Sequence, residues 1–225
     1  MEVRSPCRTI EQRVCNDFPH SQLSTLNFMQ KLTIQEMNRL SADAFREAEK
    51  LPLVVVLDNV RSQHNVGAVF RTADAFLLEG LYLCGITPKP DTLSTNNDLH
   101  KTALGAEQTV AWQAFAETMD AVKALQARGY KVYAVEQAHH SITLEQAADE
   151  MKKEMVRPGD RTSLKKGVAI VLGHEVFGVK QEVVDTCDGC IEIPQYGTKH
   201  SLNVSVTAGI VMYALATAMR SKKTL

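Results

Sequence analysis

The stretch "IPQYGTKHSLNVSVTAGIVMYALATAM", residues 193–219, carries no charged side chain from Leu202 to Met219. Pro194 and Gly197 are typical of the end of a strand, and the serines and the asparagine that follow give the next helix a polar first turn. A surface helix would show a charged face, so this segment predicts a buried helix. It reaches the lower length limit of a membrane helix, but its polar residues and many alanines favour a core helix.

The rest of the chain alternates strand-like and helix-like segments. The apolar run "LPLVVVLDNV" at 51–60 predicts a strand buried on both faces, and the following pattern predicts a helix with Asn65 as its N-cap. A helical arm is predicted over 32–51. We therefore expect an α/β fold, a mainly parallel sheet flanked by helices, in a domain at 51–225 preceded by an N-terminal extension at 1–50.

Composition limits the functional classes. The net charge of −1 gives no overall basic field, although basic residues gather locally at 152–166 and in the C-terminal tail. Five cysteines, an odd number, and no signal peptide indicate a reducing, cytoplasmic location. Cys187 and Cys190 form one C-x-x-C, but no second pair follows, so we predict no metal site. A long polar loop is expected at 87–100.

Three predicted strands end in loops with small and polar residues: "DNVRSQHNVGAVFRTA" at 58–73, "VLGHEVFGV" at 171–179 and "IPQYGTKHSLNVS" at 193–205. Ligands in open α/β sheets bind beyond the carboxyl ends of strands, so these loops predict one site. No G-x-G-x-x-G fingerprint is present. The glycine spacing of the second loop is that of a P-loop, but Val179 stands where the lysine belongs, which excludes an NTPase site.

Together the three segments resemble the SpoU (TrmH-like) family of S-adenosylmethionine-dependent RNA ribose 2′-O-methyltransferases, of the SPOUT superfamily. The family's N-x-G-x-x-x-R-T-A, G-x-E-x-x-G and I-P-…-S-L-N-V-S patterns occur in family order. The matching residues are Asn65, Gly67, Arg71, Thr72, Ala73, Gly173, Glu175, Gly178, Ile193, Pro194, Gly197, Ser201, Leu202, Asn203, Val204 and Ser205.

The resemblance implies a deep trefoil knot over about 167–220, closed by the uncharged helix. It also implies a homodimer that binds S-adenosylmethionine in the knotted loops, acts on RNA, and has neither a metal nor a membrane segment. The residues implied to be catalytic are Arg71, Asn65, Glu175, Ser201 and Asn203. Those implied to bind the cofactor are Gly173, Ile193, Pro194, Ser201 and Leu202.

Methyl transfer to a ribose requires a 2′-hydroxyl aligned with the methyl donor and removal of a weakly acidic proton. In the family the arginine matching Arg71 is proposed as the base, but a guanidinium stays protonated up to very high pH. We expect Arg71 to bind a phosphate and stabilise the developing alkoxide, with the base role left open. His200 lies within the third segment, but its position alone does not place it in the catalytic set.

The substrate is left open among related alternatives. Relatives of this compact build mostly act on tRNA, so the sequence favours guanosine 2′-O-methylation of tRNA, with rRNA as the alternative. Methylation of a base nitrogen and a non-catalytic, knotted RNA-binding protein are further alternatives. The first would normally lack the S-L-N-V sequence, and the second would have no reason to keep Arg71 together with Asn203.

Overall fold

The computed structural model describes residues 30–92, 97–154 and 167–220. The chain divides between Leu40 and Ser41 into two compact units. Helix α2, Ala42–Glu47, lies at the start of the second unit, where the Ser41 side chain caps it by accepting a hydrogen bond from the backbone of Ala44. The helix is shorter than the one predicted over 32–51, and the division falls ten residues before the predicted boundary.

In its described residues, the second unit contains a seven-stranded sheet in which every pair of neighbouring strands is parallel, in the order β3-β2-β1-β6-β4-β7-β5. The strands are β1 (Leu51–Asp58), β2 (Leu78–Cys84), β3 (Trp112–Phe115), β4 (Tyr130–Val135), β5 (Ile142–Thr143), β6 (Gly167–Leu172) and β7 (Gly189–Glu192). The predicted parallel α/β fold is confirmed. The two-residue strand β5 was not predicted, because it is too short to show a periodic pattern.

The central strands are buried on both faces, as the apolar run predicted. In β1, Leu53 and Leu57 belong to one core cluster, whereas Val54 and Val56 belong to the other. Side chains alternate between the two faces of a strand, so each core receives every second residue. Parallel sheets require this double cover because their crossover connections place helices on both faces.

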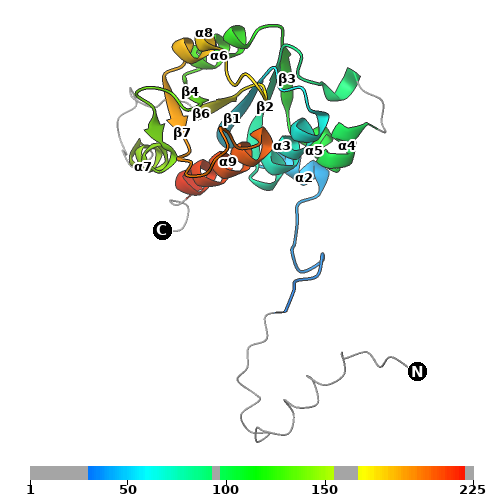
Figure 1. Cartoon of the computed structure of the whole chain (residues 1–225). Helices are drawn as coiled ribbons and strands as arrows, with labels where there is room; N and C mark the ends of the chain where they lie inside the picture. The colour runs from blue at the N-terminus through cyan, green and yellow to red at the C-terminus, as the bar shows by residue number, and fades with distance from the viewer. Residues whose placement is uncertain (1–29, 93–96, 155–166, 221–225) are drawn as a thin grey trace, which may run out of the picture. The chain divides into compact units, whose positions relative to one another are not determined.

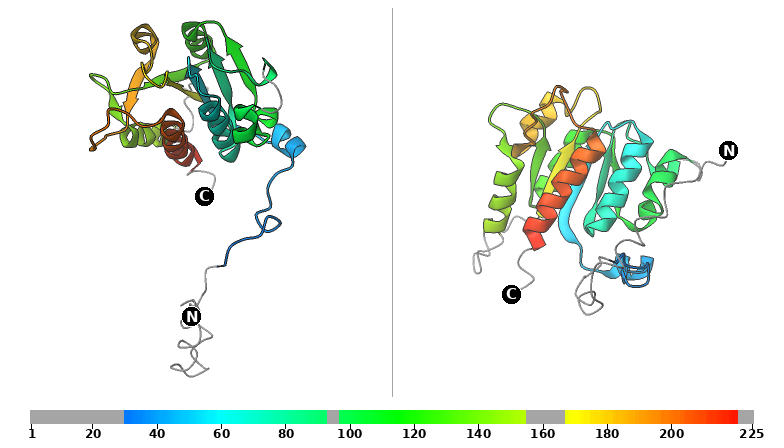
Figure 2. Two further views of the ribbon diagram at one scale, coloured as in Figure 1. Left: turned by 45° about the vertical axis from the view of Figure 1, so that its right-hand side comes forward. Right: turned by 60° about the horizontal axis from the view of Figure 1, so that its bottom comes forward.

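Helices form a layer on each face of the sheet (Figure 1). One layer contains α3 (Gln63–Ala75), α7 (Leu144–Glu154) and α9 (Val204–Arg220), with α4 (Asp98–Ala103) and α5 (Ala106–Thr109) packed against α3. The other contains α6 (Thr118–Ala127) and α8 (Gln181–Thr186). A short 3-10 helix, η2, spans Pro90–Thr92. Helix α9 contacts both α3 and α7 and runs between them along the sheet (Figure 2).

Helix α9 confirms the predicted uncharged helix, but only part of it is buried. Val211, Met212 and Leu215 are fully enclosed, as expected for a core helix. Val206, Ile210 and Tyr213 are instead 51%, 39% and 61% exposed. Residues four and then three positions apart lie on one helix face, so α9 shows the solvent an apolar stripe.

Strands β6 and β7 lie on opposite sides of β4, so the chain crosses that strand late in its course. The deep knot over 167–220 stays a prediction. Within the described residues, no helix combines the length and the hydropathy that a membrane-spanning helix requires.

Candidate active site

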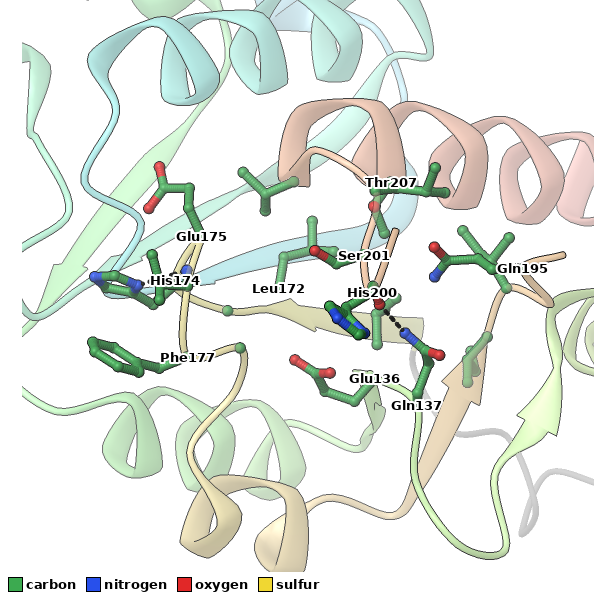
Figure 3. A pocket seen from close by; sticks show the side chains of 18 residues that line it. Glu136, Gln137, Leu172, His174, Glu175, Phe177, Gln195, His200, Ser201 and Thr207 are labelled. Atoms are coloured by element: carbon green, nitrogen blue, oxygen red, sulfur yellow. Dashed lines mark hydrogen bonds between the residues drawn. The ribbon is translucent and has the colours of Figure 1, made fainter. Parts of the chain in front are cut away.

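A cavity of about 280 Å³ lies at the carboxyl ends of β4, β6 and β7 (Figure 3). Its apolar wall comes from the ends of these strands and the residues that follow them, including Val135, Leu172, Ile191 and Ile193. Polar side chains from the connecting loops and from the first turn of α9 line the rest. These are Glu136, Gln137, His174, Glu175, Gln195, His200, Ser201 and Thr207. The cavity therefore combines an apolar wall with a polar rim.

The loop after β6 is a tight turn fixed by its own backbone. His174 and Gly178 exchange backbone hydrogen bonds of 3.1 and 2.8 Å, which brings the two ends of the loop together. A Cβ on Gly173 would lie 2.1 Å from backbone atoms of Gly178 and Val179. Gly178 has φ +67°, and its Cβ would lie 2.2 Å from a carboxylate oxygen of Glu136. Glycine is thus required at position 173 by the close approach of backbone atoms and at position 178 by the left-handed backbone conformation.

Glu175, at the tip of this loop, accepts three hydrogen bonds from the segment that starts α3. The donors are the backbone N–H of Arg61 (3.1 Å), the backbone N–H of Ser62 (2.9 Å) and the side-chain amide of Asn65 (3.1 Å). Partial burial of the carboxyl group opposes ionisation, but these hydrogen bonds outweigh that effect and lower the pKa of Glu175. Glu175 is therefore a charged group that fixes one loop against another.

Asn65 continues this connection to the third segment. Its side-chain oxygen accepts a hydrogen bond from the side-chain amide of Asn203 at 3.2 Å. The Asn203 side-chain oxygen accepts from the backbone N–H of Ser205 (2.9 Å) and of Val206 (3.3 Å), so Asn203 caps the start of α9. One hydrogen-bonded chain, Glu175–Asn65–Asn203, thus joins the start of α3 to two loop segments that are more than a hundred residues away in sequence.

A sequence model described as "SpoU rRNA Methylase family" matches residues 52–213, most of the chain and all three of these segments. The chain belongs to the SpoU rRNA methylase family. The resemblance read from the three segments is thereby confirmed.

Individual family members are similar to this chain over most of its length. The 23S rRNA (guanosine-2′-O-)-methyltransferase RlmB of Ralstonia nicotianae is 32% identical over 162 residues, covering 72% of this chain and 57% of that protein. A putative TrmH family tRNA/rRNA methyltransferase of Staphylococcus haemolyticus is 32% identical over 168 residues, covering 75% and 59%. This chain therefore spans less than two thirds of the length of these relatives.

Solved structures of the SpoU family share the fold. The A. aeolicus TrmH/SpoU tRNA modifying enzyme superposes with a TM-score of 0.62 at 27% identity, covering 81% of both chains. An AdoMet-bound rRNA methyltransferase from Sinorhizobium meliloti gives a TM-score of 0.59 at 27% identity, covering 77% of this chain and 59% of the other.

The structure brings most of the predicted site residues together. Gly173, Glu175, Ile193, Ser201 and Leu202 line the cavity. Asn65 and Asn203 reach Glu175 through the hydrogen-bonded chain described above. Pro194 is not among the cavity-lining residues, although both of its neighbours, Ile193 and Gln195, are.

One sequence prediction about α3, its N-cap, differs from the structure, and the position of Arg71 is now defined. The N-cap is Ser62, whose side chain accepts from the backbone of Asn65; Asn65 itself lies within the first turn. Arg71 is exposed and does not line the cavity. At about 100° per residue, Arg71 lies about 120° around the helix from Asn65, so the two side chains leave α3 in different directions.

Several cavity residues escaped the sequence analysis. Glu136 and Gln137 follow β4 directly, and the rule that ligands bind beyond the carboxyl ends of strands would have identified them. Glu136 accepts the backbone N–H of Val179 (2.8 Å), and Gln137 donates to the carbonyl of His200 (2.8 Å; dashed in Figure 3). His200, left outside the catalytic set, also lines the cavity.

The C-x-x-C thiols lie at the end of α8, where Cys187 is the C-cap, and in β7, which contains Cys190. The described residues hold no group of three or more His, Cys, Asp or Glu side chains placed to bind a metal ion. Burial, together with the charge of Asp188, raises the pKa of Cys187 to about 12, and burial also raises the pKa of Cys190. Both thiols therefore stay protonated near neutral pH.

Proposed function

We propose that this protein transfers the methyl group of S-adenosylmethionine to a ribose 2′-hydroxyl of RNA. The observation that carries the proposal is the hydrogen-bonded chain Glu175–Asn65–Asn203 at the rim of the cavity. A module that only bound RNA would not need to fix three distant segments around a cavity this closely. The names of the relatives, which are methyltransferases acting on RNA, support the same reaction.

The residues present fit S-adenosylmethionine. The apolar wall formed by Leu172, Ile191 and Ile193 suits the flat adenine ring, and the volume of about 280 Å³ lies close to the lower end of the range for small-molecule pockets. The absence of a side chain at Gly173 allows the two ends of the loop to pack closely, since a Cβ there would clash with backbone atoms of Gly178 and Val179. When bound, the cofactor supplies an activated methyl group. Exposed backbone groups near Gly173, Ile193 and Leu202 would hold its adenosine part.

The side chains around the cavity would serve mainly to position the substrate. Ser201 lines the cavity at the start of α9, within reach of an entering ribose. Asn65 and Asn203 hold the first turns of α3 and α9 in register. Arg71, exposed on the outer side of α3, is available to an RNA phosphate that lies along that helix. This placement favours phosphate binding over direct contact with the cofactor.

The substrate class is proposed as rRNA rather than tRNA. The sequence analysis favoured tRNA, but the names of the most similar curated relatives support the rRNA alternative: several are 23S rRNA (guanosine-2′-O-)-methyltransferases. A similar solved structure is called a tRNA modifying enzyme, so tRNA is the second candidate. The test is methyl transfer to unmodified rRNA and tRNA transcripts, followed by nucleoside analysis. Transfer to tRNA alone would reverse the choice.

We also propose that the protein is a homodimer built on α9 and located in the cytoplasm. The apolar stripe Val206, Ile210 and Tyr213 is exposed in the single chain, and burial of such a face against a second copy would stabilise both. Light scattering should give twice the mass of the chain, and Ile210→Asp should give a monomer. A wild-type monomer at micromolar concentration would exclude this dimer.

A further inference from the structure

An aromatic pair stands at one side of the cavity, on the tight loop after β6. The rings of His174 and Phe177 are 4.9 Å apart at an interplanar angle of 36° (Figure 3). Both residues line the cavity, yet Phe177 is 83% exposed and its neighbour Val176 is 71% exposed. A phenylalanine ring is therefore held in the solvent at the entrance of the proposed cofactor site.

The loop fixes these rings rather than leaving them free. The backbone bonds between His174 and Gly178 close the turn, and the backbone N–H of Val176 donates to the His174 Nδ1 at 3.0 Å, which sets the orientation of the imidazole. Glu175 anchors the tip of the turn to the start of α3. The ring of Phe177 thus has little freedom to fold back into the protein, and a binding partner meets a preformed surface.

Two exposed basic side chains adjoin this loop, one of which, Lys180, lies 3.9 Å from the carboxylate of Glu182. Arg61, whose backbone bonds Glu175, is exposed, and the Lys180 side chain, two residues beyond Gly178, is 55% exposed. The backbone N–H of Lys180 donates a hydrogen bond to the carboxylate of Asp58, with an N···O distance of 3.3 Å. Surfaces that bind single-stranded nucleic acid combine basic side chains that meet the phosphates with aromatic rings on which bases stack. The loop provides both within a few residues of the cavity.

We propose that His174 and Phe177 form a stacking surface for an unpaired RNA base beside the ribose that is methylated. The proposal rests on the proposed function, since it concerns the substrate of the same cavity. It requires the target nucleotide to be unpaired or extruded from its helix when it reaches the cavity, because a base within a duplex has no free face.

The test is a set of substitutions at Phe177, compared in methyl transfer to an unmodified rRNA transcript. Phe177→Ala should raise the KM for RNA, and weaken RNA retention in filter binding, by about 10-fold to 100-fold, the scale for loss of one stacked base. Phe177→Trp should restore both quantities. Phe177→Leu, which keeps apolar volume without an aromatic face, should not. Because Phe177 also lines the cavity, the dissociation constant for S-adenosylmethionine is measured by calorimetry for each variant, and the RNA measurements are made at saturating cofactor.

Leu104→Ala is the matched control, because Leu104 is an exposed apolar residue (67%) outside the cavity lining. RNA affinity within twofold of wild type for Phe177→Ala, or full rescue by leucine, would overturn the stacking proposal while leaving the methyltransferase intact. A change in molecular mass of Phe177→Ala by light scattering would assign the ring to contact between copies and would also overturn it. No methyl transfer by the wild-type protein would instead remove the proposed function itself.

Discussion

Glu175→Gln tests whether this carboxylate holds the three segments together. The change keeps the size of the side chain but removes its charge and replaces one acceptor oxygen with an amide that donates. At least one of the three donors, Arg61, Ser62 or Asn65, then loses its acceptor. A hydrogen bond to a charged group contributes about 1.5–3 kcal/mol. Because Glu175 is only partly buried, we expect a loss of about 1–2 kcal/mol in the free energy of unfolding.

The contribution of Glu175 to the free energy of unfolding should depend on pH. The folded-state pKa of Glu175 is lowered, so its contribution is complete above the ordinary carboxyl pKa of about 4.3 and is lost as the pH falls through the lower, folded-state pKa. Urea unfolding should therefore show the full difference between wild type and Glu175→Gln at pH 7, and a smaller difference in acid. By thermal unfolding the difference at pH 7 is about 2–8 °C in Tm.

Glu47→Gln serves as the control, because Glu47 is an exposed carboxylate at the end of α2. It should leave the free energy of unfolding within about 0.5 kcal/mol of wild type. Equal stability of Glu175→Gln and wild type at pH 7 would refute the reasoning. So would a deficit that is the same at neutral and acid pH, since a purely steric effect would not titrate.

Three further substitutions address other parts of the site. Gly173→Ala places a Cβ 2.1 Å from backbone atoms of Gly178 and Val179, so the loop must move. Calorimetry should then show at least a tenfold loss of affinity for S-adenosylmethionine. Unchanged affinity would show that the loop does not shape the pocket. Asn203→Ala should lower the free energy of unfolding by about 0.5–2 kcal/mol through loss of the α9 cap. Asn203→Ser should restore stability but not single-turnover methyl transfer; recovery of both would contradict a positioning role. The Arg71→Lys variant should bind S-adenosylmethionine normally but transfer the methyl group about a hundredfold more slowly. A near-normal transfer rate would contradict a catalytic role for Arg71.

The sequence predicted the features that depend on local pattern. The buried run that became β1, the uncharged helix α9 and the convergence of three loops all follow from periodicity and from where parallel strands end.

Features that depend on spatial neighbours were not predictable in this way. Periodicity shows that the residues of α9 are apolar, but not which of them the sheet covers, so the exposed stripe at Val206 and Ile210 emerged only in three dimensions. The position of Glu136 after a strand can be read from the sequence, but its hydrogen bond from Val179 depends on β6 lying beside β4. Arg71 follows Asn65 in the same motif, yet the helical turn carries it to another side of α3.

The most direct test of the account is nucleoside analysis after incubation of the purified protein with S-adenosylmethionine carrying a labelled methyl group and an unmodified rRNA transcript. We predict labelled 2′-O-methylguanosine in wild-type reactions and its loss when Asn65→Ala removes the link between Glu175 and Asn203. Label found only on a base nitrogen, or no label with either rRNA or tRNA, would contradict the proposed ribose methyltransferase.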